Sequence, residues 1–140
     1  MKNNNEIKKL NNKGFSLVEL IIVIAIMAVL IGVLAPQYLK YVEKSRQSAD
    51  LDTVDAMVSA VETYSADPAN SIVTGSLTCT NGVISTDTDV AAALSDAGIS
   101  VPTTALMKSN AYQNWVITFG STGLTFTGTN GSALQTAMGR

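Results

Sequence analysis

The hydrophobic and polar positions divide the chain into three zones. Residues 1–14 are polar, residues 15–35 are almost entirely apolar, and residues 36–140 mix apolar with polar side chains. Ser16 and Glu19 are the only strongly polar side chains of the middle zone. A helix of its 21 residues would be about 31 Å long, which is roughly the thickness of the hydrocarbon layer of a bilayer. The pattern therefore predicts a membrane-spanning helix over residues 15–35.

A cleaved secretory signal peptide or a buried core helix would also contain an apolar stretch. The apolar part of a signal peptide is usually about 7–15 residues long, and this zone is longer. It also contains Glu19, and it places Pro36 directly after the small-residue sequence Val33–Ala35, where proline would hinder signal peptidase. An ordinary core helix seldom has an uninterrupted apolar run such as Leu20–Ala35. Both alternatives are therefore less favoured than a membrane span.

Basic residues flank the apolar zone unequally. Residues 1–14 contain four lysines and one glutamate, which gives them a net charge of +3. Three basic residues, Lys40, Lys44 and Arg46, follow the zone within a similar distance. Since basic residues are enriched in cytoplasmic flanks, we expect the N-terminus in the cytoplasm and residues 37–140 outside.

A helical pattern continues beyond the apolar zone. Its apolar positions are Leu51, Val54, Val58 and Val61, with Met57 and Tyr64 beside them, and its polar positions are Asp52, Asp55, Ser59 and Glu62. Spacings of three and four on two faces are typical of an amphipathic helix, and Pro68 ends it because the residue before a proline avoids helical geometry. We therefore expect one nearly continuous helix from Phe15 to Ala66. The only break is expected at Pro36, whose ring would clash with the carbonyl oxygen of Gly32.

Two hairpins are predicted in the second half of the chain. An Asn-Gly pair separates Leu77–Thr80 from Val83–Thr86, and this pair is a strong signal for a two-residue turn. A Gly-Ser-Thr-Gly sequence separates Trp115–Phe119 from Leu124–Thr127. The alternation of apolar residues on these strands predicts a small antiparallel sheet with one buried face.

A short helix is expected between the hairpins. Asp87 or Thr88 would cap a helix over Asp89–Ala97, and Gly98 would end it. Such a small head has little core of its own, so the sheet is expected to pack against the Val54, Val58 and Val61 face of the long helix, with Trp115 and Cys79 as core residues. The expected fold class is α+β, a long N-terminal helix packed against a small antiparallel sheet.

The composition narrows the chemistry of the chain. With no histidine and the single cysteine Cys79, the sequence excludes histidine-based catalysis, cysteine-rich zinc sites and an intrachain disulfide. The formal net charge of −2 argues against a nucleic-acid surface. Asp87 and Asp89 could ligate calcium, but acids at a helix cap and first turn are far commoner. We expect no catalytic residues, no metal and no cofactor.

Residues 13–19, with the sequence KGFSLVE, precede the apolar run. This motif resembles the class III signal of type IV prepilins, a superfamily that includes pilus subunits and the pseudopilins of type II secretion. The resemblance covers roughly residues 1–40, with Pro36 where many pilins have a proline. The leader length and Phe15 look closer to the type IVa group than to the longer-leader type IVb group.

The resemblance implies a processing site and an assembly site. A prepilin peptidase would cut between Gly14 and Phe15, and Phe15 would be N-methylated. Glu19 would act in assembly and methylation by pairing with the Phe15 amine of a neighbouring subunit; the alternative is an acid tolerated at the membrane interface. Gly32 and Pro36 would let the helix loosen when the subunit leaves the bilayer.

Four segments follow from these expectations. Residues 1–14 would be the cleaved leader, residues 15–35 the transmembrane and filament-core helix, residues 36–67 its amphipathic continuation, and residues 68–140 the globular head. The expected function is that of a type IV pilin, which polymerises with itself into an extracellular filament for adhesion, twitching motility, biofilm formation or DNA uptake.

The expected partners are further copies of the chain, the prepilin peptidase and N-methyltransferase, the pilus assembly platform and the cytoplasmic membrane. One alternative is a type II secretion pseudopilin or a minor pilin. Another is an unprocessed, single-span, membrane-anchored binding module.

Overall fold

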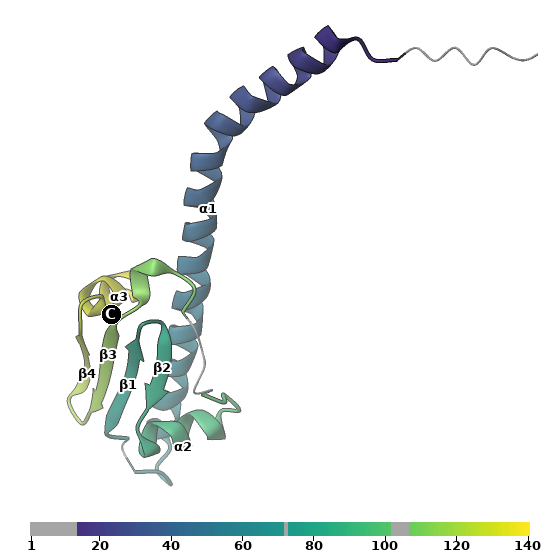
Figure 1. Cartoon of the computed structure of the whole chain (residues 1–140). Helices are drawn as coiled ribbons and strands as arrows, with labels where there is room; N and C mark the ends of the chain where they lie inside the picture. The colour runs from purple at the N-terminus through teal and green to yellow at the C-terminus, as the bar shows by residue number, and fades with distance from the viewer. Residues whose placement is uncertain (1–13, 72, 102–106) are drawn as a thin grey trace, which may run out of the picture. The chain divides into compact units, whose positions relative to one another are not determined.

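The computed structural model of the chain describes residues 14–71, 73–101 and 107–140. The chain forms two compact units that meet between Tyr38 and Leu39. The long helix α1 (Leu17–Ala66) contributes to both of them. The second unit contains the sheet and all remaining described helices (Figure 1).

The first unit consists, where it is described, of a short segment without regular secondary structure and the start of α1. All of its described side chains are exposed. Among the described residues, α1 is the one helix that is long and apolar enough to cross a membrane. It begins at Leu17, two residues after the expected start.

Pro36 does not interrupt α1, so the expected break there is wrong. The helix is continuous through Pro36. A proline inside a helix removes one backbone hydrogen bond, in this case to the carbonyl oxygen of Gly32, while the bonds on either side can persist. The lost bond therefore marks a weak point within one helix rather than a boundary between two.

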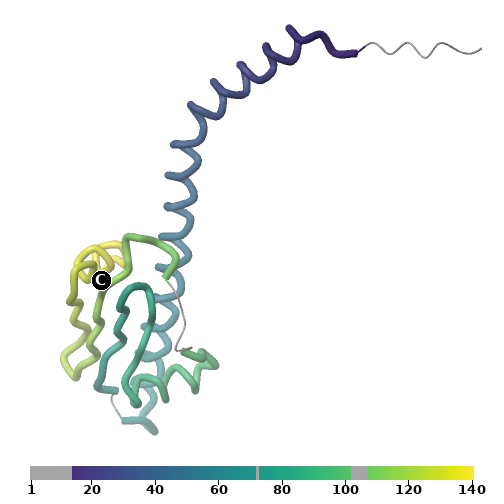
Figure 2. Tube along the Cα trace, in the orientation of Figure 1, coloured from purple at the N-terminus to yellow at the C-terminus, as the bar shows by residue number. Residues whose placement is uncertain are grey.

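The second unit is built on a four-stranded antiparallel sheet with the strand order β2-β1-β3-β4 (Figure 2). Its strands are β1 (Gly75–Thr80), β2 (Val83–Thr86), β3 (Trp115–Gly120) and β4 (Gly123–Thr127). Both hairpins expected from the sequence are confirmed. The two hairpins are joined side by side through the β1–β3 pair, in which Leu77 lies opposite Ile117.

The turn between β1 and β2 depends on left-handed backbone geometry. Asn81 has a φ of 51° and Gly82 a φ of 78°, as a two-residue hairpin turn requires. A Cβ atom on Gly82 would also lie 2.8 Å from the side chain of Gln113. Glycine is therefore needed here mainly for its conformation, since the end of the Gln113 side chain can shift.

Three short helices complete the described part of the second unit. They are α2 (Thr88–Asp96), the 3₁₀ helix η1 (Asn110–Tyr112) and α3 (Gly131–Met138). The helix α2 matches the expected helix within one residue at each end, while η1 and α3 were not expected. Figure 1 shows α2 at one end of the sheet and α3 at the other.

The capping predicted for α2 is only partly correct. Asp87 occupies the N-cap position, but its side chain makes no capping hydrogen bond. Its carboxylate instead accepts hydrogen bonds from the backbone amide and the hydroxyl of Ser76 on β1, at 2.7 and 2.9 Å. Asp87 thus joins the start of α2 to the first strand.

The core lies between the sheet and one face of α1, as the sequence predicted. The helix contributes Val54, Met57, Val58 and Val61, and the strands contribute Leu77, Cys79, Ile84, Trp115, Ile117 and Phe119. Val90 and Leu94 of α2 and Leu134 of α3 close the two ends. The Trp115 indole is fully buried, and its N–H donates to the carbonyl oxygen of Tyr112 at 3.1 Å.

Candidate processing and assembly site

The segment expected to be cut lies outside any helix or strand and is exposed. Gly14, Phe15 and Ser16 lie outside any helix, and the Phe15 side chain is 89% exposed. Among the residues that the structure describes, a Cβ atom on Gly14 would meet nothing within 4 Å. A peptide bond in such a segment can enter an extended protease cleft without unfolding α1. The structure therefore leaves the Gly14–Phe15 bond accessible.

Glu19 has a local partner at the start of α1. Its carboxylate accepts a hydrogen bond of 2.8 Å from the backbone amide of Ser16, and the carbonyl oxygen of Ser16 accepts from the amide of Leu20 at 3.2 Å. Ser16 is thus the residue from which the helix starts, and Glu19 satisfies one of the amides that a helix start leaves without a partner.

The sequence carries a local signal for this contact, although the contact was not expected. A serine followed three residues later by glutamate, just before an apolar run, is the pattern of a capping box. A carboxylate in the first turn also interacts favourably with the positive end of the helix dipole. Glu19 is therefore held at the same end of the helix as Phe15, four residues away in sequence.

Gly32 and Pro36 lie within α1 and are exposed. A Cβ atom on Gly32 would meet nothing within 4 Å, so no contact within the described part of this chain requires glycine at that position. The structure brings neither residue near Glu19, which lies more than three helical turns away.

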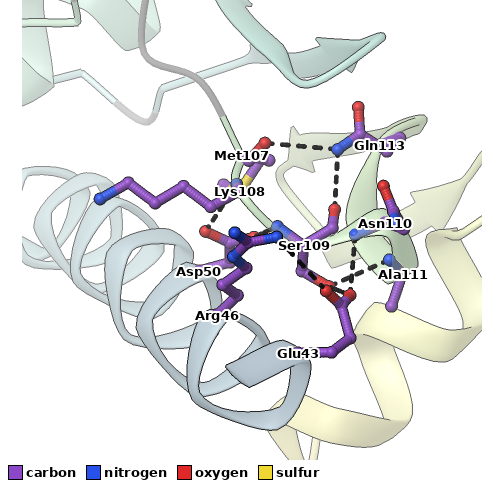
Figure 3. A network of polar contacts seen from close by, with 9 residues as sticks. All are labelled: Glu43, Arg46, Asp50, Met107, Lys108, Ser109, Asn110, Ala111 and Gln113. Atoms are coloured by element: carbon purple, nitrogen blue, oxygen red, sulfur yellow. Dashed lines mark hydrogen bonds and ion pairs between the residues drawn. The ribbon is translucent and has the colours of Figure 1, made fainter. Parts of the chain in front are cut away.

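A polar network fastens the loop before η1 to α1 (Figure 3). Asp50, which is buried, accepts hydrogen bonds from the backbone amides of Lys108 at 3.1 Å and Ser109 at 2.6 Å. The Ser109 hydroxyl donates to Glu43 at 2.8 Å, and the amide of Asn110 donates to the same carboxylate oxygen at 2.9 Å. Two carboxylates, about two helical turns apart on α1, thus hold three consecutive backbone amides.

Hydrogen bonding stabilises the charged form of Glu43. The Ser109 hydroxyl and the Asn110 amide, followed by the nearby guanidinium of Arg46, hold the pKa of Glu43 below its ordinary value.

The sequence also carries a signal for the network, although the network was not expected. Asp50 lies four residues before Val54 and seven before Met57, on the face that is buried, so a polar partner was required there.

A second set of charges joins the end of α3 to α1. The Arg140 guanidinium donates to Glu62 at 2.5 Å and to Asp55 at 3.5 Å. The hydrogen bond to Glu62 is the largest cause of a raised Arg140 pKa. All three side chains are partly exposed, so these are surface salt bridges; we call the set of Arg140, Glu62 and Asp55 the Arg140 clasp.

Cys79 is buried in the core. Its thiol donates to the carbonyl oxygen of Gln113 at 3.3 Å, and burial raises the pKa of the thiol. A buried thiol that stays protonated is a poor nucleophile. Within residues 14–71, 73–101 and 107–140, no group of three or more histidine, cysteine or acidic side chains could hold a metal ion.

Comparison with known proteins identifies a motif that includes Gly14–Ser16 and the first part of α1. Residues 9–35 match the family model described as the prokaryotic N-terminal methylation motif. The chain carries this motif. It spans Gly14, Phe15 and Glu19, and it ends where the apolar zone ends.

The chain is also similar to fimbrial proteins. It is 36% identical over 101 residues to the fimbrial protein EcpC of Eikenella corrodens, a match that covers 69% of this chain and 63% of that protein. It is 41% identical over 51 residues to the type IV major fimbrial protein FimA of Dichelobacter nodosus, which covers 36% of this chain and 33% of FimA. The chain thus spans less than two thirds of the length of these relatives. The expected resemblance to type IV prepilins is confirmed.

No solved structure matches the chain significantly.

Proposed function

We propose that the protein is a type IV pilin, a structural subunit without enzymatic activity that polymerises with itself into an extracellular filament. The single observation that carries this proposal is the methylation motif, which covers an apolar helical segment whose described side chains are all exposed. An isolated helix of this kind leaves a large apolar surface without a partner, and either lipid or other copies of the helix can cover it. The similarity to a type IV major fimbrial protein supports the same function.

The precursor has its N-terminus in the cytoplasm and residues 15–35 in the membrane, with the rest of the chain outside. The net charge of +3 on residues 1–14 favours this orientation. The prepilin peptidase removes residues 1–14 and methylates the new amine of Phe15. Removal of the charged leader frees the apolar helix to leave the bilayer and pack in the core of the filament, on the assembly platform.

Glu19 guides the docking of each incoming subunit. In the uncut chain its carboxylate binds the Ser16 amide at 2.8 Å. That hydrogen bond uses one oxygen and leaves the other available to the Phe15 amine of a neighbouring subunit. An ionised carboxylate in lipid is poorly solvated, so pairing with a cation lowers its energy. The same pair would fix the axial register between helices that could otherwise slide.

The stretch from Gly32 to Pro36 loosens during assembly. Pro36 already removes the hydrogen bond to the carbonyl oxygen of Gly32, and glycine costs about 0.8–1 kcal/mol relative to alanine inside a helix. Few additional hydrogen bonds would have to open there. Residues 36–67 continue the helix into the head, and residues 68–140 form the filament surface.

Filament yield in Glu19 variants tests this proposal. Cells carrying the wild-type chain, Glu19→Asp or Glu19→Ala are sheared, and the filament fraction is compared with the processed membrane pool. We expect full assembly, intermediate assembly and almost none, with the membrane pool unchanged in all three.

Asp52→Ala is the matched control, because it removes an exposed acid from the same helix outside the membrane span. A wild-type filament yield from Glu19→Ala would contradict the pairing. An absence of filaments from the wild-type chain, with the protein retained in the membrane, would contradict the pilin itself and favour a membrane-anchored binding module.

A further inference from the structure

A groove with an acidic rim lies between the last third of α1 and α2. Its lining includes small side chains and one aromatic ring, which we call its floor, namely Ala56, Ala60, Ala93, Ala97 and Tyr64. Two exposed acids, Asp67 and Asp96, also line it, and we call them its acidic rim. A second hollow continues from it past Tyr64 and Asn70 and reaches Asp89. Within the described part of the chain, none of these three acids forms an ion pair.

The opposite end of the head carries lysines. Lys40 and Lys44 lie one helical turn apart on α1, and Lys108 lies on the loop that the polar network fastens to the same helix. All three are exposed, and Tyr41 between the first two is 68% exposed. In Figure 3 the Lys108 side chain points away from the network. We call these three lysines and Tyr41 the cationic end.

Within the described residues, no ion pair uses the lysines of the cationic end or the acids of the groove. The two acids that face the cationic end, Glu43 and Asp50, are already engaged by backbone amides and by Ser109. The acids of the groove rim have no described basic side chain beside them. The head therefore presents two unlike charged surfaces at its two ends.

We propose that the groove of one subunit receives the cationic end of a second copy of this chain. The inference rests on the proposed function and adds to it the two head surfaces that meet. Charge complementarity selects the partner: a contact between two grooves or between two cationic ends would place like charges together, which costs several kcal/mol. A groove-to-end contact is heterologous, and such contacts repeat into an open helical polymer when the rotation between copies does not close a ring.

The contact also fixes an axial offset between the two copies. The groove is centred near residue 61 of α1 and the cationic end near residue 42. Along one helix these positions are about 29 Å apart, at 1.5 Å per residue. The lysine stems and Tyr41 can cover the small-residue floor while the ammonium groups reach the acidic rim.

Charge reversal in the full-length chain tests the contact. Asp96→Lys reverses the rim, Lys44→Glu reverses the cationic end, and the double variant exchanges the two charges. Asp52→Lys is the matched control, since it makes the same charge change on an exposed acid outside the groove. Sheared filament is measured against the processed membrane pool, and protease resistance of that pool reports the folding of the head.

Each single reversal should lower filament yield about tenfold, because opposite charges become like charges at the contact. The double variant should regain most of the yield, and Asp52→Lys should match the wild type. Equal yields from Asp96→Lys and Asp52→Lys would overturn the contact while leaving the pilin proposal intact. A double variant with a filament yield no higher than that of the single variants would also overturn the contact. So would Asp96→Lys filaments that assemble normally but no longer adhere to a surface, because the groove would then bind an outside ligand.

Discussion

The carboxylate of Asp50 accepts a hydrogen bond of 2.6 Å from the backbone amide of Ser109, 59 residues further along the chain. A second hydrogen bond from Lys108 reaches the same side chain. These bonds join the loop before η1 to the helix that bears the whole head, and they do so at a buried position.

Replacing Asp50 should destabilise the head. Asp50→Ala leaves two backbone amides without their acceptor, and we expect a loss of about 2–3 kcal/mol in the free energy of unfolding. Asp50→Asn, which retains one acceptor oxygen, should be intermediate. Urea unfolding of the full chain in detergent, followed by the fluorescence of Trp115, measures the loss. Asp52→Ala serves as the control and should change stability by less than about 0.5 kcal/mol; equal effects at both positions would contradict the role of Asp50.

The stability of the head should depend on pH through Glu43. Its pKa is lowered in the folded state from an ordinary value of 4.5. The stabilisation from its hydrogen bonds to Ser109 and Asn110 is therefore fully present above that value and is lost as the pH falls through the lower, folded pKa. Unfolding curves of the wild type and Glu43→Gln should differ at pH 7 and converge in acid. A difference that grows on acidification would contradict this assignment.

The Arg140 clasp should make a small, salt-sensitive contribution. Arg140→Ala removes the pairs with Glu62 and Asp55, and because all three groups are partly exposed, we expect a loss of about 0.2–1 kcal/mol. The loss should shrink in 1 M salt, where charges are screened within about 3 Å. Arg140→Lys should retain part of the effect. Thermal unfolding in low and high salt would refute the clasp if the loss were the same in both.

Cys79 should stay inert in assembled filaments. Its burial and raised thiol pKa predict negligible alkylation by iodoacetamide until the head unfolds. Reducing agents should leave filament stability unchanged, because a single thiol cannot close a loop. A dimer band that dithiothreitol removes, and that is missing from Cys79→Ser, would show that the thiol is exposed to a partner.

The elements that the sequence predicted correctly are those with local signals. Apolar spacing defined α1 and its buried face, and the Asn81-Gly82 pair defined the first hairpin because few residues other than asparagine and glycine adopt left-handed geometry easily. The methylation motif was recognised for the same reason, since it is contiguous, while the roles of Gly14, Phe15 and Glu19 stay predictions.

What the sequence did not predict depends on contacts between distant segments. Asp87 or Thr88 was expected to cap α2; Asp87 occupies the N-cap position, but its carboxylate binds Ser76 on the neighbouring strand. The Glu43 and Asp50 network requires the loop before η1 to return to α1, which no local pattern encodes. The helix α3 is only eight residues long, and so short a segment depends on packing against the sheet more than on its own propensity.

The mass of the subunit in sheared filaments tests the central claim most directly. Intact-mass and N-terminal peptide mass spectrometry should find a chain that begins at Phe15, carries one methyl group on its amine and is the main protein of the filament. Gly14→Val should block this cleavage, because a branched side chain would obstruct an extended backbone in the protease cleft. A subunit that begins at Met1 or at Pro36 would contradict the account.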